Sequence, residues 1–397
     1  MNKYFKFLII ATVMVSLAGC NQESENKALN IEVSNDLDFP RNEVVSIDYE
    51  KLENFLKGRS MDNLRIRKRD AEQYIRSQWI DYDQDGNPDE LLFPAEVEAS
   101  SMAEYEVVLD SAKSAPESDV IAYSRFVPER TDDYTWENDK VAFRTYGPTG
   151  QKEALEGVPG STLSSGIDLW LKRTEKAIID KWYAEHLKNP GYYHIDHGEG
   201  YDPYHVGGSR GTGGSGVWED DSLYVSQNYT DYRTIADGPL RTVFELDYAE
   251  WSPYNVTETK RITLDLGTNF SKFEVDLSAE DSLPNYAVGI TLHENEGKYE
   301  LNPEEGWVVH WEVIDSSYVG QALVLNPKII DSSFAAVSKV QDQSNLLILT
   351  QPRDKITYYA GFGWEKSDQI KTLENWQELV KKQSRIISSP LEVVITE

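Results

Sequence analysis

The segment between Gly191 and Trp218 is the part of the sequence richest in side chains that could do chemistry. Three of the six histidines, His194, His197 and His205, fall within twelve residues, among several tyrosines and carboxylates. Such groups serve as general acids and bases, and they also bind metals. Any one of these histidines could simply satisfy loop carbonyls. Three of them together favour a reaction centre.

Zinc is the weaker interpretation of this cluster, because its spacing matches no helical His-Glu-x-x-His pattern. In an extended backbone, His194 and Asp196 would share one face and His197 would take the other, but the glycines that follow are equally compatible with a loop. The glycine-rich stretch 207–216 lacks the Lys-Ser/Thr ending of a phosphate loop. It indicates either a backbone that approaches a ligand closely or a long turn.

A second motif, residues 81–90, has the pattern of a calcium loop. Asp81, Asp83, Asp85 and Asp89 occupy positions one, three, five and nine, with a glycine at position six for the tight turn. Leu92 stands where an EF-hand has its bidentate glutamate, and the flanking residues are strand-like, as in the calcium loops of integrin-type repeats. An acidic hairpin turn without an ion is the alternative. Because four crowded carboxylates repel one another, we expect a structural Ca²⁺.

Several cations could gather into one pocket for an acidic ligand, since arginine grips a carboxylate through two parallel hydrogen bonds. Trp170 lies close to two of them in the sequence. The alternative is that these cations pair with the many surface acids, which is the interpretation we favour for Lys172. The candidates are Arg144, Lys172, Arg173, Arg210 and Arg233.

The composition restricts the kind of partner. With 68 acidic and 39 basic residues, the formal charge is −29, which excludes a general nucleic-acid binder. The same charge means that an anionic ligand needs a local basic pocket. The 10 tryptophans and 23 tyrosines are typical of a β-rich protein whose aromatic faces can stack on sugars.

The N-terminus has the order of a bacterial export signal. Lys3 and Lys6 precede a short apolar run, and the segment ends in Leu-Ala-Gly-Cys, which resembles a lipobox with Cys20 as the lipidated residue. Residues 1–20 are therefore a predicted lipoprotein signal peptide, and polar residues 21–35 a flexible tether. Cys20 is the only cysteine, so no internal disulfide can form. We expect a monomer, lipid-anchored outside the cytoplasm at the outer membrane, on its periplasmic face or at the cell surface.

Short alternating or β-branched runs bounded by Gly, Pro, Asn and Asp recur to the end of the chain and predict a mainly β protein. The expected fold is an antiparallel β-sandwich, with a galactose-mutarotase-like supersandwich as one arrangement of it and a few short helices. Helices are predicted at 49–56, 177–187 and 372–382. We divide the chain into an N-terminal strand-rich part, 36–130, and a large sandwich, 131–397, which would carry catalysis. A single continuous two-sheet domain fits nearly as well.

Five motifs spread over the mature chain together resemble a Bacteroidota polysaccharide-utilisation family. That family was long described as a domain of unknown function, and one member is an ulvan oligosaccharide dehydratase. The motifs are Trp136–Pro148, Ser165–Trp170, Asp180–Tyr183, His194–Gly200 and Asp237–Arg241.

The resemblance implies an exported β-sandwich enzyme that eliminates water from a non-reducing-end uronic acid and leaves a C4–C5 unsaturated uronate. This chemistry needs a base for the C5 proton, an acid for the departing hydroxyl and cations near the carboxylate. No cofactor is needed for it. We assign His194 or His197 as base and Tyr201 as acid or partner. The substrate-binding candidates are Arg144, Arg210, Trp170 and Tyr146.

Two other functions remain open at the level of the sequence. A polysaccharide lyase performs the same elimination with a glycan as leaving group, so only the products distinguish it from a dehydratase. A non-catalytic glycan-binding lipoprotein would use the Trp and Tyr side chains as its platform, and the histidine cluster would then be incidental.

The lipid anchor can be tested directly. Replacing Cys20 with Ser removes the thiol that accepts the diacylglycerol, so the variant should move from the membrane fraction to the soluble fraction when the cells are fractionated. A Cys20→Ser protein that stays with the membrane would exclude lipidation at this residue.

Overall fold

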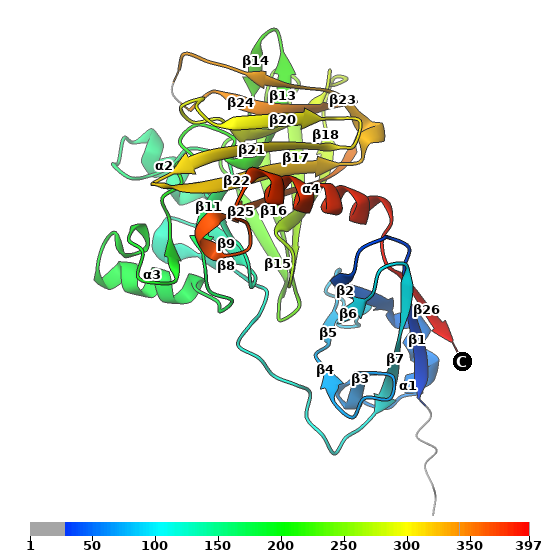
Figure 1. The fold of residues 1–397 in the computed structure, drawn as a ribbon. Coiled ribbons are helices and arrows are strands. Elements are labelled where there is room, and N and C mark those ends of the chain that lie inside the picture. Colours follow the sequence, from blue (N-terminus) through cyan, green and yellow to red (C-terminus); the bar gives the residue numbers. More distant parts are fainter. Residues whose placement is uncertain (1–27, 341, 397) are drawn as a thin grey trace, which may run out of the picture.

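The computed structural model describes residues 28–340 and 342–396 (Figure 1). The predicted signal peptide with Cys20, and residues 21–27 of the predicted tether, lie outside the described residues. Within the described ranges, no helix has the length and apolar character needed to cross a membrane. The strands build a small N-terminal unit and a larger β-sandwich (Figure 1).

Two antiparallel sheets and one helix, α1 (Tyr49–Leu56), form the N-terminal unit. Alternation of apolar and polar residues in β1 buries Ile31 and Val33 in its core, together with Leu52 of α1. One sheet has the order β26 (Glu392–Thr396), β1 (Leu29–Asn35), β7 (Ser101–Leu109), β3 (Leu64–Lys68), β4 (Tyr74–Ile75). The other has the order β2 (Arg41–Asp48), β6 (Glu90–Val97), β5 (Gln78–Ile80). The last strand of the chain is thus paired with the first.

Two further sheets pack face to face and confirm the predicted antiparallel β-sandwich. Apolar residues of both, among them Phe244, Leu323, Tyr286 and Ile348, share one core. The eight-stranded sheet has the order β15 (Asp231–Asp237), β16 (Arg241–Trp251), β17 (Val256–Asp265), β18 (Phe270–Ser278), β25 (Lys355–Trp364), β22 (Ser317–Leu325), β21 (Trp307–Ile314), β20 (Lys298–Asn302). The five-stranded sheet has the order β14 (Ser222–Tyr224), β13 (Thr212–Glu219), β19 (Tyr286–Thr291), β24 (Asn345–Thr350), β23 (Ile330–Ala336).

A third five-stranded sheet lies against one side of the sandwich. Successive side chains along its strands point to opposite faces, so Trp136 and Leu169 pack into the sandwich core. Trp170 lies on the other face, where Trp182 and Tyr183 of α3 cover it. The order is β12 (Gly200–Tyr201), β11 (Asp168–Lys172), β10 (Ala142–Thr145), β9 (Asp133–Glu137), β8 (Tyr123–Val127). The helices attached to it are α2 (Pro148–Leu155) and α3 (Ile179–Lys188).

The helix α4 (Leu373–Ser388) packs on β21 and β22 of the eight-stranded sheet (Figure 1). Thr372 caps it by accepting a hydrogen bond from the Asn375 amide at 3.3 Å. The fully buried Trp376 lies over Gly320, and its indole nitrogen donates to the Gln321 carbonyl at 3.1 Å. The remaining helices are the 3₁₀ turns η1 (Met61–Asn63), η2 (Pro128–Arg130), η3 (Tyr192–His194), η4 (Pro327–Ile329) and η5 (Glu365–Ser367).

The glycine-rich stretch serves packing in this fold. It turns at residues 207–209 and continues into β13. Gly211 has a left-handed φ of 58°, and a Cβ on it would collide with the Ile167 carbonyl. The close approach that the glycines permit is therefore between two backbone segments of the protein.

Gly320 offers a test of the packing of α4. A Cβ at this position would lie 2.6 Å from the Trp376 ring, so Gly320→Ala should destabilise the fold by about 1–3 kcal/mol through overpacking. Thermal unfolding of the two proteins measures the difference. Gly208→Ala is the control, because no heavy atom lies within 4 Å of a Cβ there. Equal melting temperatures for the Gly320→Ala variant and the wild type would contradict the packing described for α4.

Candidate functional site

Charged groups from β9, β10 and β11, and from the residue that follows β12, meet around one buried guanidinium, that of Arg144. Arg144 in β10 donates from Nε to Asp168 Oδ2 of β11 at 2.8 Å, and from Nη2 to Asp202 Oδ2, just after β12, at 2.9 Å. Its Nη1 lies 3.8 Å from Asp133 Oδ2 of β9. The Arg144 side chain is only 7% exposed. We call Arg144, Asp133, Asp168 and Asp202 the Arg144 cluster.

Aromatic rings enclose the cluster. The Arg144 guanidinium carbon lies 5.4 Å from the centre of the Tyr146 ring, 5.2 Å from that of Trp170 and 5.5 Å from that of Tyr193. These distances allow cation–π attraction in a desolvated setting. Trp170 and Tyr146, two predicted substrate-binding residues, are therefore buried neighbours of Arg144.

The cluster holds more negative charge than Arg144 balances when its three carboxyl groups are ionised. Burial raises the pKa of Asp133 to about 6, with Arg144 opposing the shift. Burial, followed by the charge of Asp168, raises the pKa of Asp202 well above its ordinary range. Clusters of perturbed carboxyl groups are typical of functional sites.

Several buried polar atoms of the cluster lack a hydrogen-bond partner among the described residues. They are Asp133 Oδ1, Asp202 Oδ1, Arg144 Nη1 and, beside them, Trp170 Nε1. Buried polar groups are usually hydrogen-bonded, so four unpaired atoms so close together set this cluster apart from an ordinary core.

His194 stands at the solvent side of the Arg144 cluster, at the end of η3. Its Nδ1 lies 2.9 Å from the Asp202 carbonyl oxygen, which can only accept, so Nδ1 carries the proton. The same nitrogen is 3.6 Å from Asp202 Oδ2, and the side chain is 53% exposed. Nε2 is then the basic nitrogen. A base oriented in this way by a fixed acceptor is suited to proton abstraction.

The other predicted catalytic residues lie apart from Arg144. His197 is exposed and stacks on the Tyr192 ring, with 4.0 Å between ring centres. Tyr201 donates its hydroxyl proton to Asp315 in the β21–β22 turn at 2.7 Å. Burial and this bond raise the pKa of Tyr201, so the phenol stays protonated at neutral pH.

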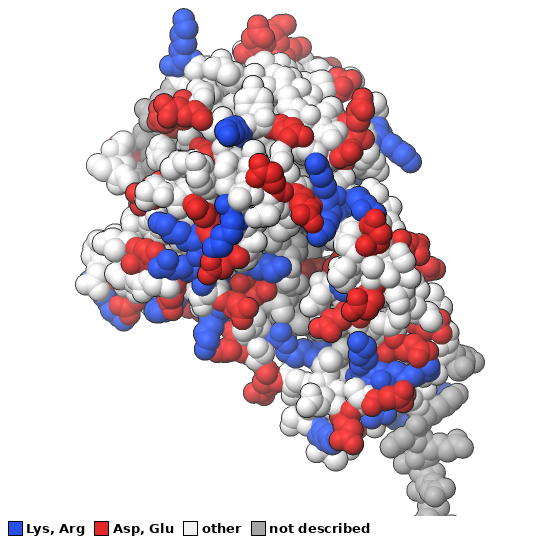
Figure 2. Space-filling model, viewed as in Figure 1, with Lys and Arg blue, Asp and Glu red and all other residues white. Residues whose placement is uncertain are grey.

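The predicted cationic pocket does not form among the described residues. Arg210 is buried in the sandwich, where Nη1 donates to Ser165 Oγ at 2.9 Å and to the Ser215 carbonyl at 3.0 Å; burial lowers its pKa to about 10. Lys172 forms a buried pair with Glu137 at 2.7 Å. Arg173 pairs with Asp196, and Arg233 with Glu245. On the face drawn in Figure 2, basic side chains are interspersed with acidic ones.

Comparison with known proteins shows the family of the chain. Residues 33–393 match the sequence model described as "Domain of unknown function (DUF4861)". The chain belongs to the DUF4861 family. It is 45% identical over 395 residues to "Uncharacterized protein P7" of Formosa agariphila, a match that covers 98% of each chain. The predicted membership in a family of unknown function is thereby confirmed.

Two solved structures from Enterococcus faecalis resemble this DUF4861 protein distantly. One is a protein in glycosyl hydrolase family 38, with 10% identity and a TM-score of 0.49, and the other an α-mannosidase, with 9% identity and a TM-score of 0.48. Each match covers 93% of this chain, but the chain spans only about half of those longer proteins, 47% and 46%. At this similarity, nothing about activity follows.

Sequence reasoning on this DUF4861 protein missed the three aspartates of the Arg144 cluster. Asp168 lies within a motif that the sequence analysis singled out, and Asp202 lies within the histidine-rich segment, but neither position indicated a shared partner. Asp133 carried no local signal. Only the pairing of β10 with β9 and β11, which sets Arg144 opposite Thr135 and Asp168, brings the groups together.

The predicted calcium loop joins β5 to β6, as its strand-like flanks indicated. Carboxylate oxygens of Asp81, Asp83 and Asp89 lie within 4.8 Å of one another, which fits a hard cation with oxygen ligands. The Asp85 carboxylate lies outside this group and accepts a hydrogen bond from the Asn87 amide at 2.7 Å. Gln84 in the same loop donates to the Thr234 carbonyl of β15 at 2.9 Å, so the loop also contacts the sandwich.

Calcium binding to the native state should raise the free energy of unfolding by mass action. The gain is about 2.7 kcal/mol at an ion concentration about 100 times Kd, seen as a higher melting temperature with calcium than with a chelator. Asp83→Asn should lose this response. Asp85→Asn should keep it, because the Asp85 carboxylate lies outside the three-oxygen group. A wild-type melting curve that is the same with calcium and with chelator would exclude the ion.

Proposed function

We propose that this DUF4861 protein is an exported, lipid-anchored enzyme that removes water from a uronic acid at the non-reducing end of an oligosaccharide. The observation that carries the proposal is the placement of His194. Its Nδ1 is hydrogen-bonded to the Asp202 carbonyl, its side chain is 53% exposed, and the Asp202 carboxyl group lies behind it, with Oδ2 3.6 Å from Nδ1. The family resemblance supports the choice of substrate class.

The reaction needs only proton transfers and one bond rearrangement. Nε2 of His194 takes the proton at C5, next to the substrate carboxylate. The electron pair left at C5 forms the C4–C5 double bond as the C4–oxygen bond breaks, and the departing hydroxyl takes a proton and leaves as water. The pKa of Tyr201 is raised, so its phenol is protonated at neutral pH, and in this proposal it supplies that proton. No oxidant, reductant or organic cofactor enters this balance.

Arg144 acts through its neighbours in this proposal. With a side chain that is 7% exposed and in contact with three carboxyl groups, it holds Asp202 beneath His194. It is a positioning residue.

His194 and His197 allow a matched test, since both are exposed and they lie three residues apart. His194→Ala should reduce turnover by about a hundredfold or more, because the base acts in the transition state, while the melting temperature stays near that of the wild type. His197→Ala should keep turnover within about threefold. The measurement is loss of one water from saturated uronate-terminated oligosaccharides, followed by mass spectrometry.

The products also separate the alternatives. Chain cleavage with an unsaturated end would identify a polysaccharide lyase, and absence of any product from the wild type would favour a glycan-binding protein. If His194→Ala keeps full activity while His197→Ala loses it, the base assignment is wrong even though the reaction class stands.

A further inference from the structure

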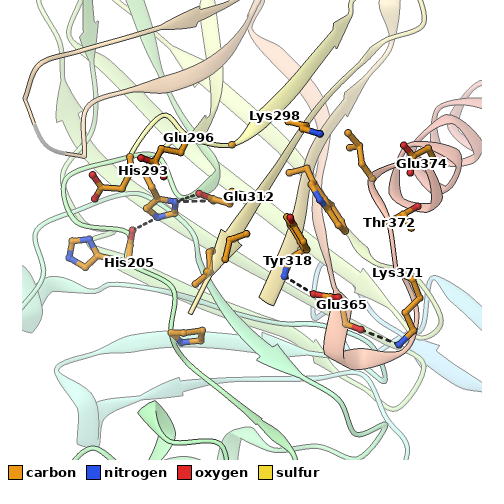
Figure 3. Close-up of a pocket in the computed structure, with 17 residues that line it drawn as sticks. His205, His293, Glu296, Lys298, Glu312, Tyr318, Glu365, Lys371, Thr372 and Glu374 are labelled. Atoms are coloured by element: carbon orange, nitrogen blue, oxygen red, sulfur yellow. Dashed lines mark hydrogen bonds and ion pairs between the residues drawn. The ribbon is translucent and has the colours of Figure 1, made fainter. Parts of the chain in front are cut away.

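A cavity of about 610 Å³ opens at one end of the sandwich (Figure 3). Its wall comes from the β19–β20 loop, β21, the start of β22, η5 and the first turn of α4. Pro203 and His205 also line it, and they follow Asp202 directly in the chain. One short segment therefore runs from the Arg144 cluster to this cavity. A volume of this size accommodates a sugar unit.

An exposed aromatic ring forms one side of the cavity. Tyr318 is 42% exposed, whereas Trp311 behind it is only 6% exposed. The two rings are stacked, with 5.2 Å between centres and 12° between planes, and the Tyr318 amide donates to Glu365 at 3.0 Å. The Tyr318 ring is thus held in a fixed orientation. A fixed aromatic face provides apolar contact area of the kind that the C–H face of a pyranose can use.

Polar groups surround this ring. Glu365, Lys371, Thr372 and Glu374 stand on the side of η5 and α4, and Lys298 on the side of β20 (Figure 3). Carboxylates outnumber ammonium groups in the lining, since Glu294, Glu296 and Glu312 also contribute. Carboxylates accept hydrogen bonds from hydroxyl groups, but they repel a uronate or a sulfate ester. The lining therefore favours an uncharged, hydroxyl-rich ligand.

His293 makes the wall next to His205 rigid. Its Nδ1 lies 2.9 and 3.0 Å from the two oxygens of Glu312, and its Nε2 lies 2.8 Å from the His205 carbonyl (Figure 3). Both partners accept, so the ring satisfies both when it is doubly protonated. Burial alone would lower the pKa of His293, but the bond to Glu312 outweighs it and the net pKa is raised. With both nitrogens committed, His293 is a structural group of the wall.

We propose that this cavity binds an uncharged sugar unit, with its ring stacked on Tyr318 and its hydroxyls bonded to Glu365, Lys371 and Glu374. The carbohydrate class of the ligand rests on the proposed function. The site would hold a part of the glycan other than the uronate that reacts, which separates recognition of the chain from chemistry on its end.

Tyr232 provides a matched control for Tyr318. It is also a half-exposed tyrosine, at 38%, stacked on a neighbouring ring, with 4.4 Å between its centre and that of Phe126 and 13° between planes. It lies on β15, which with β20 forms the two opposite edges of the eight-stranded sheet. Tyr318→Ala and Tyr232→Ala therefore remove equivalent side chains from different places.

Isothermal titration calorimetry on the mature protein tests the proposal with xylotetraose, cellotetraose and mannotetraose as neutral probes and a uronate-terminated tetrasaccharide as the acidic probe. At least one neutral probe should bind the wild type. Tyr318→Ala should weaken that binding by about tenfold or more through loss of stacking, while Tyr318→Phe and Tyr232→Ala should bind as the wild type does. Melting temperatures confirm that each variant is folded.

Two results would overturn the inference: no neutral probe binds the wild type, or Tyr318→Ala binds as tightly as Tyr232→Ala. The titration needs no turnover, so its outcome is independent of the dehydratase assay. Neutral binding that depends on Tyr318, in a protein that makes no product, would support the cavity and refute the proposed reaction. Loss of water from the substrate without such binding would support the proposed reaction and refute the cavity as a sugar site.

Discussion

The candidate site depends on the ion pairs that three carboxyl groups form with the single guanidinium of Arg144. Three buried carboxyl groups from neighbouring parts of one sheet approach a single guanidinium. Taking these groups out of water is costly, and that cost is offset only while all of them stay together. The pairing of β9, β10 and β11 and the position of Asp202 are therefore coupled. The Asp202 carbonyl accepts a hydrogen bond from His194, so the same arrangement also orients the His194 ring.

The balance between burial and charge also accounts for the other cations. In a chain with a formal charge of −29, a surface arginine finds an acidic partner readily, and Arg173 and Arg233 do so. Arg210 is buried, and burial lowers its pKa to about 10 although the charge of Glu258 opposes the shift. The carboxylate-rich cavity at the other end of the histidine-rich segment then suits a neutral ligand better than an acid. The proposed enzyme would bind the acidic part of a glycan near His194 and a neutral part in the cavity at Tyr318.

The sandwich could be predicted from the sequence because strand alternation is a local pattern. The helix 49–56 was predicted at its observed bounds, and the calcium-type loop between two strands was likewise a local signal. The site was harder, because strand neighbours decide it. Nothing near Arg210 indicated that its side chain faces the core. Nor could composition show that Trp136 and Trp170 are buried while Tyr318 carries an exposed ring.

The pairing of β26 with β1 restricts the order in which the parts of the protein can fold as the chain is synthesised. The chain leaves its site of synthesis from the N-terminus, yet the N-terminal sheet needs residues 392–396 to cover one edge of β1. Until those residues arrive, that edge presents unpaired backbone groups, which are prone to pairing with other chains. The N-terminal unit, which is synthesised first, is thus among the last to be completed, and its folding depends on synthesis of the whole chain.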